Sequence, residues 1–158
     1  MPLVRRKRPQ IGDIIEIPTP VGFAYAQYTH KHDAPPKYGA LLHVLPGFHE
    51  LQLSEFSSLA AQRAQFITFF PLGAACNREI VRVVANEVIP SHARDFPTFR
   101  ASVKTPNGRG PWWLWDGTKE WRVGKLEAGM ELLPIREVVN DALLIERIVQ
   151  GWRHEFDT

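Results

Sequence analysis

The sequence predicts a mostly β domain of the α+β class. Short runs of β-branched and aromatic residues recur through the first two thirds of the chain, and turn-forming residues separate them. One apolar repeat at helical spacing then occupies the C-terminal part. The length of 158 residues fits one domain, and 44% hydrophobic with 23% charged residues is typical of a folded protein. We therefore expect a flexible basic arm over residues 1–10 and a single domain over residues 11–158.

The first strands follow this arm directly. Residues 11–17 are rich in β-branched side chains, and residues 18–22 are rich in turn-forming residues. Residues 23–30 alternate with a period of two, so the two runs predict a hairpin. A polar stretch with two prolines precedes a third run over residues 39–45. Three short strands with these turns predict a small SH3-like curved sheet or a partly open barrel.

The middle of the chain predicts shorter elements. We expect a helical turn around residues 57–63 and a buried strand over residues 66–70. Residues 79–85 predict another strand, in which Arg82 interrupts the branched residues as a charge would at a sheet edge. Between residues 90 and 111 proline and glycine are so frequent that we expect no regular element longer than about five residues.

A tryptophan-rich hairpin gives the clearest local signal. Two alternating aromatic runs over residues 112–123 flank Asp116 and Gly117, a pair that readily adopts the positive φ angles of a tight turn. Residues 134–156 then repeat apolar side chains at helical spacing, so they predict a C-terminal helix. Leu143 and Leu144 fall off the main apolar stripe of this helix. Either the helix is covered on more than one side, or these residues form an accessory contact surface, which leaves a symmetric homodimer open.

The charge balance says little about partners. The chain has 19 Lys and Arg against 17 Asp and Glu, but residues 5–8 supply four of the positive charges, so 15 against 17 remain. A short terminal run is usually a solvated arm, and we do not expect a nucleic-acid-binding domain. No apolar stretch reaches the roughly 20 residues that span a bilayer, and the N-terminus has no apolar signal core. We therefore expect a cytoplasmic protein that does not contact a membrane.

Familiar catalytic and metal-binding patterns are missing from the sequence. It has no phosphate-binding glycine loop, no nucleophile elbow and no helical zinc motif, and its single cysteine, Cys76, cannot form an internal disulfide. His30 and His32 would share a strand face beside Asp33, but two imidazoles do not complete a metal site. We predict a non-enzymatic protein without catalytic residues, metal or cofactor. An unfamiliar enzyme at these histidines is retained as a third alternative.

Residues 11–28 carry a family resemblance. The segment IGDIIEIP at residues 11–18, followed by a short turn and FAYAQ at residues 23–27, resembles the opening of the immunity protein 26 family of bacterial polymorphic toxin systems. The segments FPTFR at residues 96–100 and WLWDG at residues 113–117 are compatible with the layout of that family. The resemblance implies a protein that binds and neutralises a cognate toxin made by its own cell, through surface complementarity.

Aromatic residues are the main candidates for binding a partner. Aromatic side chains dominate both protein cores and binding hot spots, and the hairpin holds four tryptophans. The predicted function is toxin immunity. The alternative is an SH3-like barrel that binds nucleic acid or a peptide through its basic arm and two tyrosines. The candidate partner-binding residues are Tyr25, Tyr28, Phe96, Arg100, Trp113, Trp115 and Trp121.

Overall fold

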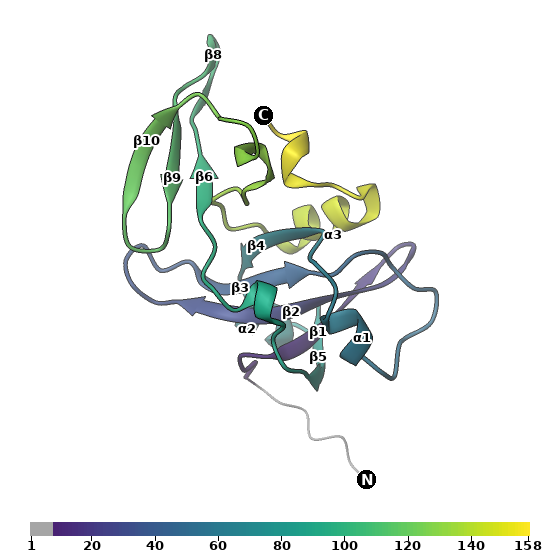
Figure 1. Cartoon of the computed structure of the whole chain (residues 1–158). Helices are drawn as coiled ribbons and strands as arrows, with labels where there is room; N and C mark the ends of the chain where they lie inside the picture. Colours follow the sequence, from purple (N-terminus) through teal and green to yellow (C-terminus); the bar gives the residue numbers. More distant parts are fainter. Residues whose placement is uncertain (1–7) are drawn as a thin grey trace.

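An antiparallel sheet of five strands forms the centre of the protein (Figure 1). The computed structural model describes residues 8–158, so most of the predicted basic arm lies outside the described residues. The strand order is β4-β3-β2-β1-β5, which makes β4 and β5 the edges of an open sheet and not parts of a closed barrel. The five strands are β1 (Asp13–Thr19), β2 (Gly22–His32), β3 (Gly39–Val44), β4 (Phe66–Phe70) and β5 (Arg82–Asn86).

The predicted first hairpin is confirmed, and its turn requires glycine. Strands β1 and β2 pair antiparallel, with Ile17 opposite Ala24. The Thr19 hydroxyl donates to the Gly22 carbonyl oxygen at 2.7 Å and closes the turn. A Cβ atom on Gly22 would lie 2.5 Å from the His49 carbonyl oxygen, and the φ angle there is 142°. A side chain at this position would therefore both strain the backbone and collide with it.

Two short helices flank the central sheet. Helix α1 (Ser57–Ala60) confirms the predicted helical turn, and its buried Leu59 packs with Tyr25 on one face of the sheet. Helix α2 (Leu72–Asn77) was not predicted, because a six-residue helix begun by Pro71 and Leu72 gives no periodic signal. Its buried Leu72 and Ala75 join the larger core on the opposite face. Tertiary packing thus stabilises α2 where local propensity is weak.

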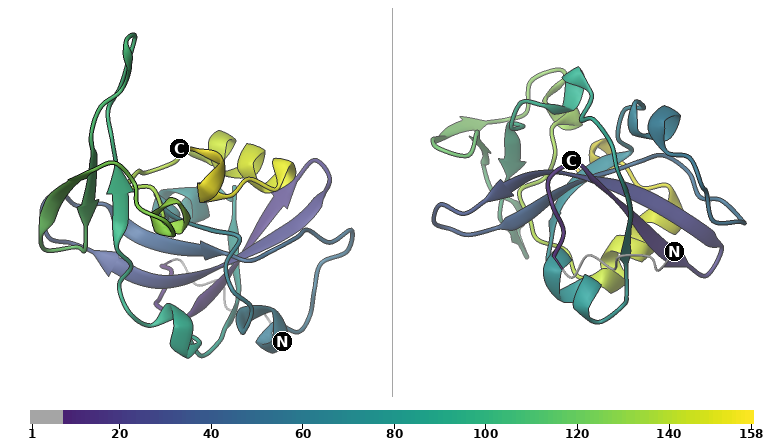
Figure 2. Two further views of the ribbon diagram at one scale, coloured as in Figure 1. Left: turned by 45° about the horizontal axis from the view of Figure 1, so that its top comes forward. Right: turned by 90° about the horizontal axis from the view of Figure 1, so that it is seen from below.

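A smaller sheet of three strands stands beside the central sheet (Figure 1). Strands β9 (Trp112–Trp115) and β10 (Glu120–Gly124) confirm the tryptophan hairpin, and β6 (Phe99–Ala101) pairs with β9 on its other side. The turn is a four-residue loop in which the Asp116 carboxylate accepts hydrogen bonds from the N–H groups of Thr118 and Lys119, at 3.0 and 2.8 Å. These bonds lower the pKa of Asp116. Between Ala101 and Trp112, the short strands β7 (Lys104–Thr105) and β8 (Gly108–Arg109) form an arm that extends away from the domain (Figures 1 and 2).

Aromatic rings connect the two sheets. The ring of Phe69 on β4 lies 5.2 Å from that of Phe99 on β6 and 6.2 Å from that of Trp115 on β9. The His32 ring of β2 meets Trp115 edge-on at 4.9 Å. Such offset and edge-to-face pairs stabilise a core beyond their buried area. We call this set the aromatic cluster: His32, Tyr38, Phe69, Phe96, Phe99 and Trp115.

The C-terminal helix is shorter than the apolar repeat predicted. Helix α3 spans Asp141–Gln150, whereas residues 134–140 are extended. Parallel bridges join Ile135 to Arg100 of β6 and Val138 to Phe69 of β4. This segment therefore pairs with backbone groups of both sheets, which would otherwise remain unpaired at the strand edges. The apolar spacing at residues 134–140 serves extended pairing and not a helical face.

Helix α3 packs on the central sheet. Leu144 and Ile148 are buried in the same core as Ile15 and Ile17 of β1. Leu143 packs against the same core, so of the two alternatives the structure agrees with a helix covered on more than one side, and Leu144 does not form an accessory contact surface. In the described part of the chain, no helix is long and apolar enough to cross a membrane.

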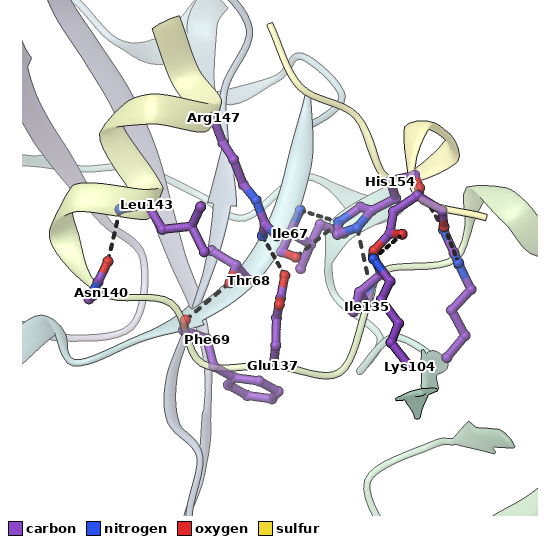
Figure 3. A network of polar contacts seen from close by, with 12 residues as sticks. Ile67, Thr68, Phe69, Lys104, Ile135, Glu137, Asn140, Leu143, Arg147 and His154 are labelled. Carbon is purple, nitrogen blue, oxygen red and sulfur yellow. Dashed lines mark hydrogen bonds and ion pairs between the residues drawn. The ribbon is translucent and has the colours of Figure 1, made fainter. Parts of the chain in front are cut away.

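A buried histidine attaches the C-terminal segment to the sheet (Figure 3). His154 begins the short 3₁₀ helix η3 (His154–Phe156). Its Nδ1 accepts a hydrogen bond from the Ile135 N–H at 3.2 Å, and its Nε2 lies 3.0 Å from the Ile67 carbonyl oxygen. Nε2 also lies 3.1 Å from the Ile67 N–H, so backbone N–H groups meet both ring nitrogens, and these contacts favour the neutral ring over the doubly protonated one. The neutral form of His154 thus links β4 to the extended segment before α3.

We expect acid to destabilise the fold through two buried histidines. Burial lowers the pKa of His154 to about 3 and that of His43 to about 4, from 6.5. Below about pH 6.5 these histidines bind more protons in the unfolded chain than in the folded chain. The free energy of unfolding therefore decreases as the pH is lowered through that range. Each histidine adds a slope of about 1.4 kcal/mol per pH unit until its folded pKa is reached. Urea unfolding at a series of pH values measures this slope, and a His43→Gln variant with an unchanged slope would contradict it.

Candidate partner-binding surface

A hollow lies beside the tryptophan hairpin, on one face of the small sheet. Its volume is about 430 Å³. Trp113 of β9 is 40% exposed on this face, and Val103 is also exposed at the hollow. Single exposed apolar side chains are common on protein surfaces, but exposed apolar side chains gathered at a hollow mark a contact surface. The lining residues are Ala101, Ser102, Val103, Pro111, Trp113, Leu114, Trp115, Glu120 and Arg136.

An ion pair forms the polar rim of this hollow. Arg136 Nη1 donates to the Glu120 carboxylate at 2.7 Å, and Arg136 Nε donates to the Tyr38 hydroxyl at 2.9 Å. The guanidinium also lies 4.2 Å from the centroid of the Trp115 ring, a cation–π distance. Arg136 therefore has a fixed position, and its charge is balanced by Glu120. Neither rim residue was predicted, because 16 positions separate them in the sequence and local patterns do not indicate their contact.

The exposed tryptophans of the hairpin lie on opposite faces. Arg122 is the cross-strand neighbour of Trp113, and Leu114 is that of Trp121. Directly opposed residues of an antiparallel pair share a face, and successive residues alternate. Trp113 therefore faces the hollow and Trp121 faces away from it, although each is 40% exposed. The two side chains therefore cannot both contribute to one flat contact surface.

Burial removes four of the seven predicted partner-binding residues from reach. Tyr28 lies in the core beneath α3. Tyr25 is buried on the opposite sheet face, where its hydroxyl donates to Glu16 at 2.9 Å and accepts from the Leu53 N–H at 2.8 Å. Trp115 is buried in the aromatic cluster. The burial of these three residues, and of Arg100 described below, corrects the expectation that they contact a partner. Their side chains contribute to the fold.

Arg100 is a structural residue in the interior. Its side chain is fully buried and donates hydrogen bonds to four backbone carbonyl oxygens, which belong to Glu131, Leu133, His154 and Asp157. Its guanidinium lies 4.7 Å from the centroid of the Trp112 ring. Burial lowers the pKa of Arg100. The residue fixes the C-terminal segment against the small sheet.

Phe96 and the histidines near it belong mainly to the cluster between the sheets. Phe96 is half-buried against Trp115, with ring centroids 5.6 Å apart. His32 packs in the same cluster, and the Nε2 of His30 lies 2.8 Å from the Arg94 carbonyl oxygen. Asp33 instead forms an exposed salt bridge with Lys31 at 3.6 Å. Within residues 8–158, no group of three or more His, Cys, Asp and Glu residues could hold a metal ion.

Cys76 lies at the edge of the larger core. It is half-buried in α2 and packs against that core. Burial raises the pKa of its thiol, which disfavours the nucleophilic thiolate. The position fits a small apolar group and gives no sign of covalent chemistry.

The small sheet and its arm are positively charged relative to the rest of the domain. Residues 99–125 contain six Lys and Arg and two Asp and Glu, a net charge of +4. The remaining described residues contain ten Lys and Arg and fifteen Asp and Glu, a net charge of −5. The excess is visible in the sequence, but the sheet topology is needed to show that this range holds the small sheet β10-β9-β6 and the two-stranded arm β7-β8.

The fold and the surface define a mostly β domain with a C-terminal helix and an accessible tryptophan hollow. No protein-family model, curated protein or solved structure matches this chain.

Proposed function

We propose that this protein is a non-enzymatic binding module for another protein, and that the tryptophan hollow is its contact surface. One observation carries the proposal: Trp113 is 40% exposed beside a hollow of about 430 Å³. Trp115, two residues along the same strand, is buried in the aromatic cluster. The accessible indole thus rests on a rigid support, as binding hot spots do.

The chemistry of the hollow favours an apolar side chain of the partner. Ala101, Val103 and Pro111 give it an apolar lining, and the charges of Arg136 and Glu120 balance each other at its rim. An inserted aliphatic or aromatic side chain would remove Trp113 from water without leaving an unpaired charge. The alternative function, nucleic-acid binding through an aromatic groove, is less well supported. Tyr25 and Tyr28 are buried and cannot stack on bases.

A bacterial toxin is the partner that we propose for this surface. The support is the resemblance of residues 11–28 to immunity proteins, which inhibit by binding and need no catalytic groups. In this proposal the protein acts in the cytoplasm, where it binds the toxin before the toxin reaches its target. The hollow would then receive an apolar anchor residue of the toxin domain.

We expect Trp113→Ala to weaken toxin binding about ten-fold or more while the thermal transition changes little. The probe is a toxin domain sought among the genes that neighbour the gene for this chain, and titration calorimetry measures its affinity. Trp121→Ala is a matched control, because it removes the same side chain at the same exposure from the other face. It should retain the affinity within about threefold.

A growth assay provides a second readout. Co-expression of the wild-type chain should restore growth to cells that produce the toxin domain, and Trp113→Ala should restore it less well than Trp121→Ala. If the toxin domain does not bind the wild-type chain, the immunity proposal is refuted. Equal losses in the two variants would refute the hollow as the contact surface.

A further inference from the structure

We propose that the partner contributes an acidic, extended segment that pairs with β10 as an added strand of the small sheet. This inference rests on the proposed protein-binding function and specifies how the partner docks. The free edge of β10, the cations along it and the adjacent hollow support it together.

Strand β10 is an open sheet edge. The strand order β10-β9-β6 gives β10 one neighbour among the described strands, and Figure 1 shows it at the outer side of the small sheet. The opposite edge is closed, because Ile135 bridges to Arg100 of β6. Glu120, Trp121 and Arg122 are all exposed. An edge of this kind can accept an extended peptide through main-chain hydrogen bonds.

The hairpin register identifies the backbone groups that face outward. The Asp116 N–H donates to the Lys119 carbonyl oxygen at 3.1 Å, which marks these residues as a hydrogen-bonded pair. Hydrogen-bonded and non-hydrogen-bonded pairs alternate in an antiparallel ladder. Trp121 therefore bonds inward to Leu114, whereas the N–H and C=O groups of Glu120 and Arg122 point away from β9. Glu120 and Arg122 thus present outward N–H and C=O groups two residues apart. This spacing allows main-chain hydrogen bonds to an added strand.

The charges along this edge favour an acidic segment. Lys119 precedes β10, Arg122 lies within it and Lys125 follows it, and all three are exposed. None of them forms a salt bridge with a residue in the range 8–158, whereas Glu120 is already paired with Arg136. With the net charge of +4 over residues 99–125, these unpaired cations would attract Asp and Glu in a partner strand.

The position of the hollow sets a pattern for the partner. Side chains of an added strand alternate between the two sheet faces, so every second residue lies on the hollow face. Neighbouring strands are about 4.8 Å apart, which brings a long apolar side chain within reach of the hollow beside Glu120. A register irregularity between Arg122 and Gly124 ends regular pairing, so the added strand is short. The expected sequence alternates acidic and apolar residues.

The test is selection from a random library of peptides about twelve residues long, displayed on phage, against the full immobilised chain. We expect enriched peptides that alternate Asp or Glu with large apolar residues. Arg122→Pro removes the outward N–H and the charge, whereas Arg122→Ala removes the charge alone. Affinity should therefore fall about ten-fold further in Arg122→Pro than in Arg122→Ala, because the proline variant also loses a main-chain bond.

Hydrogen exchange in the wild-type chain covers the case in which Arg122→Pro does not fold. The amides of Glu120 and Arg122 should exchange about ten-fold more slowly with the selected peptide bound. Strand addition would be overturned by unchanged amide exchange or by equal peptide affinity of the two Arg122 variants. It would also be overturned if the selected peptides showed no acidic pattern, or if the chain bound only a single-stranded oligothymidine. A selected peptide or toxin domain that depends on Trp113 but not on the Arg122 backbone would leave the proposed function intact, so the two failures are distinguishable.

Discussion

Replacement of Arg100 with methionine is expected to lower the free energy of unfolding by about 3–5 kcal/mol. Arg100 is fully buried, and its guanidinium donates to four backbone carbonyl oxygens of the C-terminal part of the chain. Methionine fills a similar length but has no donor, so these buried acceptors lose their partner. The loss should also loosen the attachment of η3, because two of the acceptors are His154 and Asp157.

Urea unfolding of wild type and variant measures this effect. Arg122→Met is the matched control, because Arg122 is exposed and the same substitution there should change stability by less than about 0.5 kcal/mol. Amide exchange over residues 152–158 should increase in Arg100→Met and stay unchanged in the control. A change below about 1 kcal/mol in Arg100→Met would show that water or other groups satisfy the four carbonyls.

Trp115→Ala is expected to cost about 3–5 kcal/mol of stability. Its ring lies 4.9 Å from His32, 5.4 Å from Phe99 and 5.6 Å from Phe96, so truncation leaves a cavity where the two sheets meet. It also removes the ring beneath the Arg136 guanidinium. The small sheet should then lose its fixed orientation relative to the central sheet.

The same truncation at Trp113 provides the comparison for this second prediction. Trp113 is two residues away on the same strand face, but 40% of it is exposed, so Trp113→Ala should cost less than about 1.5 kcal/mol. Thermal unfolding followed by tryptophan fluorescence and by far-UV circular dichroism measures both variants. Similar transition temperatures for the two would show that the aromatic cluster does not hold the sheets together.

Local patterns predicted most of the strands correctly. The runs at residues 11–17, 23–30, 39–45 and 66–70, and the tryptophan hairpin, all correspond to strands in the structure. Period-two alternation and β-branched composition are properties of neighbouring residues, so a sequence displays them directly. The edge position suggested by Arg82 is also confirmed, because β5 is an outer strand. The predicted helix was wrong at residues 134–140. The apolar spacing there suits a helix, but the strand edges of the two sheets offer backbone groups with which this segment pairs instead.

The candidate surface was predicted less well than the strands. Aromatic composition pointed to the hairpin, but it could not separate Trp113 from Trp115, because core and contact tryptophans have the same sequence pattern. The rim residues Glu120 and Arg136 gave no local signal, and the buried role of Arg100 depends on carbonyl groups about 30 or more positions away in the chain.

The sequence by itself determined the mostly β class, the order of the main strands, the tryptophan hairpin and the presence of a C-terminal helix. Tertiary structure alone decided where that helix begins, which aromatic side chains are buried, and that β10 is left as a free edge among the described strands. The physical reason is the range of the interactions. Backbone geometry follows from residues a few positions apart, whereas burial and edge pairing depend on segments that meet only after the chain has folded.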